Sequence, residues 1–167
     1  EELMVDNAEQ GLARACKETG AQVAEYTAAP VFMDAEAKCR HQWLIEFAVK
    51  PDSLEKFAEI LDASLQEINS DYEAKRYKNI TLQPLEIISA RPGLFHDWLK
   101  EKGKLGGQHK VPRLSNSREY LEEMLKIPDI FEIYNIFLKK YYNLEFKKTK
   151  TIKFEDAVAL LYIKQYF

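Results

Sequence analysis

One stretch of the sequence, residues 106–113 (GGQHKVPR), combines residue types that could bind an anion. Its two glycines would let the backbone approach a ligand closely, and Lys110 and Arg113 could hold phosphate or carboxylate oxygens. The spacing matches neither the G-x-x-x-x-G-K-[ST] phosphate loop nor the G-x-G-x-x-G dinucleotide turn. Glycine and lysine are also common in surface loops, so the spacing alone favours a plain loop over a binding site.

A second group of chemically active residues is less specific. Cys39 and His41 lie two apart and would share one face of a strand. With His96 and His109 they could form a metal site, and as a pair they could form a thiol nucleophile with its base. The paired C-x-x-C and H-x-x-x-H spacings are absent. We therefore expect structural roles for these residues and no metal site.

The composition limits the class of protein. The 167 residues are 46% hydrophobic and 31% charged, as in soluble globular chains that need no disulfide or metal to stabilise the core. The net charge of -3 argues against a nucleic-acid-binding domain, since such domains are usually basic. The sequence has no apolar run of about 18 residues, so we expect no membrane contact through a spanning helix. Two cysteines are too few for a secreted disulfide scaffold, which favours reduced thiols and a cytoplasmic location.

Three segments are expected to form a small sheet that positions these residues. Residues 22–33 have the pattern of an extended strand, in which Pro30 indicates an edge or a bulge. In residues 41–49 the apolar side chains alternate, with one strongly apolar face, so the two segments should pair as a hairpin. Residues 85–90 form a third short apolar strand, which a helical crossover should return beside the hairpin.

Helices should cover this sheet, because five segments have apolar residues at helical spacing or residues that cap helix ends. They are expected from Leu3 to a terminal glycine at Gly20, from a capping box at Asp52 and Glu55 to Ile68, after Ser70 through 72–77, over 95–99 with an end near Gly103, and from Asn116 to Leu125. The predicted fold class is α+β: a small mixed β-sheet, made of a hairpin and a crossover strand, covered by helices and followed by a C-terminal helical appendage.

The last quarter of the chain differs in composition. Residues 127–167 hold 10 of the 20 aromatic residues and no glycine, arginine or cysteine. The sequence therefore predicts two domains, 1–126 and an aromatic, Lys-rich extension at 127–167. Helices are expected at 129–142 and from about 154 to 166, and their apolar surfaces would pack on the domain or mediate self-association. Its lysines could suggest RNA binding, but its net charge of +2 is small for that role.

Residues 1–126 resemble the C-terminal domain of the acyl-acid amido synthetase family. Four motifs carry the resemblance: N-x-x-Y-x-x-x-R at Asn69, Tyr72 and Arg76, the strand PLEI at 84–87, Gly93-Leu94-Phe95, and Q-[HY]-K-V-P-R at Gln108 to Arg113. In plants these enzymes are auxin-responsive gene products that conjugate indole-acetate or jasmonate to amino acids, and bacteria have relatives. The first residues resemble those that follow the interdomain hinge, whereas the tail resembles nothing that we can place.

The resemblance implies an adenylate-forming enzyme with two half-reactions. ATP and a carboxylate give an acyl-adenylate and pyrophosphate, after which an amine attacks to give an amide and AMP. In this family a large N-terminal domain binds ATP and magnesium, and the small C-terminal domain moves between the half-reactions. It delivers a lysine to the first half-reaction, and the motif places that lysine at Lys110. A compact ammonium can neutralise charge on approaching phosphate and carboxylate oxygens.

Other residues of the motifs are implied to contact substrate or phosphate: Gln108, His109, Arg113 and Arg76. For Gln108 and Arg113 the alternative role is to position the loop. His109 stands where the plant proteins have an aromatic residue. The sequence contains no adenylation domain, so we expect this chain alone to bind no cofactor and to be inactive. Its implied partners are the parent's N-terminal adenylation domain, a small carboxylate and an amine.

A different class of function stays open. The same pattern fits a stand-alone, non-enzymatic interaction or ligand-sensing module that dimerises through residues 129–166. The two hypotheses differ in their dependence on Lys110 and on the tail.

Overall fold

The computed structural model describes residues 3–32, 39–79, 81–103, 110–128 and 140. The chain divides into two compact units, residues 1–124 and 125–167. The helices expected over 129–142 and 154–166, and the self-association expected there, lie outside the described residues apart from Lys140.

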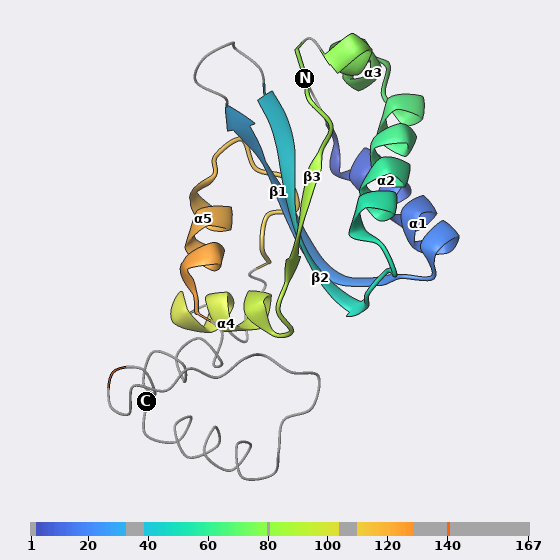
Figure 1. Cartoon of the computed structure of the whole chain (residues 1–167). Coiled ribbons are helices and arrows are strands. Elements are labelled where there is room, and N and C mark those ends of the chain that lie inside the picture. Colours follow the sequence, from blue (N-terminus) through green and yellow to red (C-terminus); the bar gives the residue numbers. More distant parts are fainter. Residues whose placement is uncertain (1–2, 33–38, 80, 104–109, 129–139, 141–167) are drawn as a thin grey trace. The chain divides into compact units, whose positions relative to one another are not determined.

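The first unit is built around a three-stranded sheet with the order β1-β2-β3 (Figure 1). Strands β1 (Gln22–Phe32) and β2 (Cys39–Val49) pair antiparallel, whereas β3 (Glu86–Ala90) pairs parallel to β2. The predicted α+β class and the mixed sheet of a hairpin and a crossover strand are therefore confirmed. Pro30 lies in the edge strand β1, as expected, and the irregular pairing in this strand lies farther back, between Gln22 and Glu25.

Helices cover both faces of the sheet (Figure 1). Helices α1 (Val5–Thr19) and α2 (Leu54–Ile68) lie on one side, and α4 (Leu94–Glu101) and α5 (Glu119–Lys126) lie on the other. The prediction that residues 41–49 have a single apolar face agrees only in part with the burial along β2. Leu44, on the opposite face from Trp43, is also fully buried, whereas Val49 is 45% exposed. Strand β2 is central in the sheet, so both of its faces contribute to the core.

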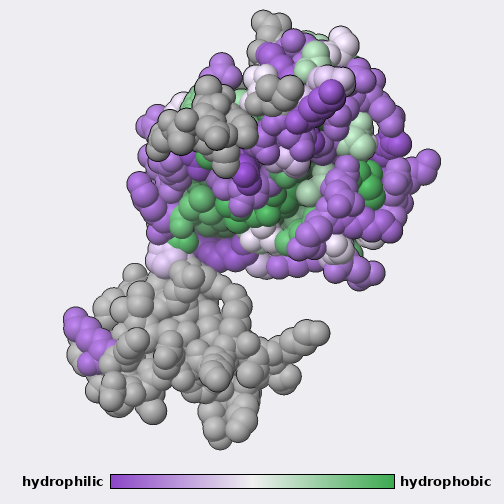
Figure 2. All heavy atoms as spheres, turned by 45° about the horizontal axis from the view of Figure 1, so that its top comes forward, coloured by the Kyte–Doolittle hydropathy of each residue, from purple (hydrophilic) through white to green (hydrophobic). Residues whose placement is uncertain are grey.

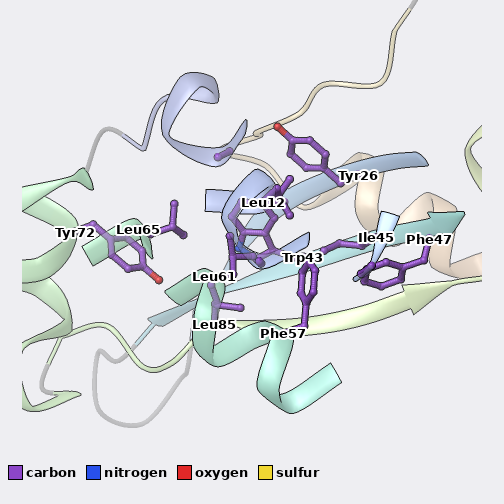
Figure 3. Close-up of a cluster of buried hydrophobic side chains, with 14 of the residues drawn as sticks. Leu12, Tyr26, Trp43, Ile45, Phe47, Phe57, Leu61, Leu65, Tyr72 and Leu85 are labelled. Carbon is purple, nitrogen blue, oxygen red and sulfur yellow. The ribbon is translucent and has the colours of Figure 1, made fainter. Parts of the chain in front are cut away.

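The main core lies between the sheet and the α1–α2 pair (Figure 3). Trp43 stacks with Tyr26 at a ring-centroid distance of 5.7 Å, and Phe47 meets Phe57 edge-to-face at 5.3 Å. Leu61 of α2 is fully buried in the same cluster. This core fixes β1 and β2, on which the candidate site is built.

Two short elements connect α2 to β3. Helix α3 (Ser70–Arg76) is followed by the single 3-10 turn η1 (Tyr77–Asn79), where Lys78 and Asn79 have positive φ angles. Among the described residues, no helix has the length and apolar character needed to cross a bilayer.

The predicted helix ends are partly correct. Gly20 ends α1 in the left-handed region, as predicted, with φ of 72°. The predicted caps at Asp52 and Ser70 are each displaced by one residue, because Ser53 caps α2 and Asn69 caps α3. Each of these side chains accepts the hydrogen bond from a free N–H group of the first helical turn. Helix α5 begins at Glu119, whose N–H donates to Ser117 Oγ and not to Asn116.

Candidate functional site

The segment 111–115 (VPRLS), which follows Lys110, lies along the outer edge of β1. Ala28 N–H donates to the Arg113 carbonyl and Ser115 N–H donates to the Ala28 carbonyl, both at 3.0 Å. These bonds form a parallel bridge between Ala28 and Leu114. The Thr27 hydroxyl donates to the Pro112 carbonyl at 2.7 Å, and Val111 is buried. The sequence is thus held to the sheet directly after the lysine.

The Arg113 side chain packs on an aromatic ring of the core. Its guanidinium carbon lies 4.6 Å from the centroid of the Tyr26 ring, within the range of a cation–π contact. Its nitrogens lie 3.2 Å from a Glu25 carboxylate oxygen and 3.9 Å from one of Glu9. These contacts hold the Arg113 side chain against β1 and α1, and its role in positioning the loop or contacting substrate stays a prediction.

Tyr26 is itself fixed in place. Its hydroxyl donates to Glu9 Oε1 at 2.9 Å, and its ring is 1% exposed and stacks with Trp43. Burial raises the pKa of the Tyr26 hydroxyl well above its usual range, and the hydrogen bond to Glu9 raises it further. The phenol is therefore a neutral donor at any ordinary pH.

Lys110 is exposed and stands immediately before the anchored segment. Within the described part of the chain its ammonium has no hydrogen-bond or ion-pair partner. Gln108 and His109, and the glycines at 106 and 107, lie outside the described residues. The contacts predicted for Gln108 and His109 therefore stay predictions.

The N-x-x-Y-x-x-x-R motif stabilises the fold around α3. Asn69 caps the helix and also donates from Nδ2 to Asn7 Oδ1 at 3.2 Å. The Tyr72 hydroxyl donates to Asp62 Oδ1 at 2.6 Å. The Arg76 guanidinium donates to both oxygens of the same carboxylate, and the Asp62 hydrogen bonds raise the pKa of Arg76.

Arg76 thus has a structural role that the sequence analysis did not assign to it. It is 8% exposed, and its Nη1 also donates to the Leu82 carbonyl at 3.0 Å. Arg76 and Asp62 line a depression of about 660 Å³ between α2 and the β3 region, together with Arg40 and Glu59. The contact of Arg76 with substrate or phosphate stays a prediction.

The thiol and imidazole groups have local structural contacts. Cys39 Sγ lies 3.7 Å from the Thr81 carbonyl, and the His41 ring lies 5.6 Å from the ring of Tyr72. Burial lowers the pKa of His41 to about 4. His96 is exposed on α4 beside Asp97. In residues 3–32, 39–79, 81–103 and 110–128, no group of three or more His, Cys, Asp or Glu side chains is placed to hold a metal ion.

A cleft of about 710 Å³, which no sequence motif indicates, lies at the end of the sheet where β1 ends and β2 begins. Its lining combines apolar side chains, among them Met4 and Phe32, with His41 and Lys75. Figure 2, in which the top of Figure 1 comes forward, shows a band of hydrophobic residues on the face turned toward the viewer. The lining comes from six separate parts of the sequence, so no local motif could have revealed it.

Comparison with known proteins places the chain in a family. The model of the GH3 family C-terminal domain matches residues 6–119. No curated protein shows significant sequence similarity to the chain.

Two solved structures share the fold. One is described as "GH3.15 acyl acid amido synthetase", with a TM-score of 0.59 and 16% identity, covering 75% of this chain and 24% of that chain. The other is "AtGH3.15 acyl acid amido synthetase in complex with 2,4-DB", with a TM-score of 0.55 and 17% identity over the same shares. The chain thus spans about a quarter of the length of these structures. Because the family model matches well over half of the chain, including Lys110 and the segment 111–115, this protein belongs to the GH3 family through its C-terminal domain.

Proposed function

We propose that this chain is the mobile C-terminal domain of an ATP-dependent acyl acid amido synthetase, and that Lys110 is the catalytic residue it contributes to acyl-adenylate formation. The observation that carries the proposal is the position of Lys110. Within the region matched to the GH3 family, this lysine is exposed and directly precedes a segment bonded to the sheet edge. An exposed lysine at the end of an anchored chain segment suits delivery of a positive charge to a second domain.

The chemistry assigned to Lys110 is electrostatic. Negative charge gathers where a carboxylate oxygen approaches the α-phosphate of ATP, and a fixed ammonium lowers the energy of that arrangement. Lysine suits this task because its charge is compact and its stem is long. Once the acyl-adenylate has formed, the attack of the amine has less need of this charge. The proposal therefore assigns Lys110 to the first half-reaction.

The contacts near Lys110 argue that ATP and Mg²⁺ bind elsewhere. Arg113, the nearest other cation of the motif, already contacts Tyr26, Glu25 and Glu9. One lysine at the end of an anchored segment makes a poor nucleotide site by itself. We infer that the parent's N-terminal adenylation domain binds ATP, Mg²⁺, the carboxylate and the amine, in the cytoplasm, and that this chain alone is inactive.

The first test is the size of the native protein, detected with an antibody raised against residues 1–126. The proposal predicts a band several times heavier than 19.5 kDa. A band at 19.5 kDa would show that this domain acts without a synthetase and would overturn the proposal.

The second test separates the half-reactions in the full-length synthetase. Lys110→Ala should reduce ATP–pyrophosphate exchange by about a hundredfold or more, which is typical for loss of a group that stabilises developing charge. Amide formation from preformed acyl-adenylate should change far less. The control is Lys56→Ala, which removes an exposed lysine of α2. Equal losses in both half-reactions would remove the assigned role of Lys110.

The alternative of a module that dimerises through 129–166 depends on residues outside those described. Deleting residues 128–167 and measuring the molar mass in solution decides it. A monomer before and after deletion excludes the alternative, whereas a dimer that becomes a monomer supports it.

A further inference from the structure

We propose that Thr27 and Tyr26 are positioning residues for Lys110. They contact the segment 111–115 from opposite faces of the sheet edge, and these contacts fix the position from which Lys110 extends. The proposal rests on the function proposed for Lys110. It assigns that function two residues of β1, more than 80 positions away in the sequence, that no motif marks.

The backbone pairing alone is a weak anchor. Both backbone hydrogen bonds between the segment and β1 involve Ala28, which donates to Arg113 and accepts from Ser115. Bonds that meet at one residue leave the segment able to pivot about it. Additional contacts must therefore fix the orientation of the segment on the sheet edge.

Thr27 supplies the first of these contacts. Its hydroxyl donates to the Pro112 carbonyl at 2.7 Å, and the side chain is 1% exposed. The β1–β2 register places Thr27 opposite Leu44, on the sheet face covered by α4 and α5. Because the Thr27 side chain is buried against the segment, a residue without the hydroxyl would remove this donor from the half-buried Pro112 carbonyl.

Tyr26 supplies the second contact, on the other face. Successive strand residues point to opposite faces of a sheet, and Tyr26 stacks with Trp43 in the core beneath α1 and α2. The Arg113 guanidinium lies over this ring, and the hydrogen bond from the Tyr26 hydroxyl to Glu9 holds the ring in place. The segment is thus held on both sides of the edge, and a shift by one residue would break both contacts.

Lys110 is close enough to these contacts to be controlled by them. It is two residues from Pro112, which is at most about 7 Å of extended chain. Pro112 itself has a restricted φ angle, which stiffens this short connection. The contacts of Thr27 and Tyr26 therefore set the direction in which the backbone runs from Pro112 to Lys110.

The test on the chain itself uses two threonines that make equivalent bonds. Thr27 and Thr19 each donate to a backbone carbonyl at 2.7 Å, but Thr19 does so within α1, to Ala15. Thr27→Val should speed hydrogen exchange at the Ser115 and Ala28 amides about tenfold and lower the NMR order parameter of the Lys110 amide. Thr27→Ser keeps the hydroxyl and should restore both. Thr19→Val should change neither, and unchanged exchange in Thr27→Val would overturn the proposal.

The functional test is a double-mutant cycle in the full-length synthetase. If Thr27 acts through Lys110, Thr27→Val should lower ATP–pyrophosphate exchange about tenfold in the synthetase that retains Lys110. In the Lys110→Ala background the same substitution should have little further effect. A merely structural role would lower exchange by the same factor in both backgrounds and would overturn the proposal. If Thr27→Val keeps normal ATP–pyrophosphate exchange whereas Lys110→Ala loses it, only the positioning role is overturned. No loss in Lys110→Ala would instead overturn the proposed function.

Discussion

Arg76 donates to both carboxylate oxygens of Asp62, over distances of 2.6 to 3.0 Å, and the two side chains are only 7% and 9% exposed. The Tyr72 hydroxyl bonds to the same carboxylate. This buried pair joins α2 to the end of α3, and among the described residues the ion-pair partner of each charge is the other one. Removal of one charge therefore leaves the other unpaired.

Asp62→Asn should destabilise the chain by about 3 kcal/mol or more, because it leaves the Arg76 guanidinium buried without its counter-charge. The measurement is the free energy of unfolding in urea. The matched control is Asp71→Asn, which removes an i,i+4 pair with Lys75 in which the Asp71 side chain is 57% exposed. That variant should cost less than about 1 kcal/mol. Equal effects in the two variants would show that burial does not matter here.

His41 should make the fold sensitive to acid. Burial lowers its pKa to about 4 in the folded chain; nearby Asp62 opposes this shift and Lys75 adds to it. The unfolded chain takes up this proton near pH 6.5, whereas the folded chain resists it down to about pH 4. The stability from neutral His41 is therefore complete above pH 6.5 and falls, by about 2 to 3 kcal/mol, as the pH drops to about 4.

Urea unfolding at several pH values between 7 and 4 checks this expectation. His41→Gln should lose less stability over that range than the parent chain. His96→Gln is the control, because the His96 side chain is 65% exposed, and its profile should follow that of the parent. Parallel profiles for all three proteins would contradict the assignment.

Helices α1 and α2 pack so closely at Gly11 that a larger side chain at this position should destabilise the fold. A Cβ at this position would lie 2.9 Å from Leu61 Cδ1 and 3.2 Å from Leu65 Cδ2. Both leucines are fully buried, so Gly11→Val should cost about 2 kcal/mol through overpacking. Ala13→Val, on the exposed side of the same helix, should cost only about 0.5 kcal/mol of helix propensity. Thermal unfolding of both variants makes the comparison, and equal shifts in Tm would refute the packing explanation.

Glu46 should stabilise the start of α4. Its Oε1 accepts the Gly93 N–H at 2.6 Å, and Gly93 is the N-cap residue of the helix, with φ of 79°. Glu46→Ala should cost about 1 to 2 kcal/mol in urea unfolding, whereas Glu46→Gln keeps an acceptor and should cost less. Identical losses would mean that the carboxylate charge, and not the hydrogen bond, matters.

The three strands could be predicted because their signals are local, whereas the pairing of β3 with β2 instead of β1 was not predicted. Alternating apolar residues in 41–49 and the helical crossover before 85–90 specify a hairpin and a third strand. The burial of Leu44 could not be predicted from the alternation, because it depends on α4 and α5 covering the second face. The predicted helix caps were wrong by one residue because neighbouring residues can suit the same cap position. Asp52 and Ser53 both suit a helix start, and only the backbone geometry decides between them.

The candidate site was predictable in one part only. The motif identified Lys110 and Arg113, but it did not identify their supports, since Thr27 and Tyr26 lie in an unremarkable strand. Arg76 illustrates the converse difficulty. A recurring arginine in a motif is compatible with ligand binding or with structure, and its buried partner Asp62 lies 14 residues earlier, outside the motif.

The outer edge of β1 has a consequence for solubility. Ala28 uses its N–H and its carbonyl in bonds to the segment 111–115, Pro30 has no N–H, and the Pro30 carbonyl accepts from Arg118 Nη1 at 3.2 Å. A foreign strand would therefore find no free backbone groups at these two residues, and open strand edges are the usual templates for aggregation. Displacing the segment would free the groups of Ala28, so aggregation during refolding should increase when this contact is weakened.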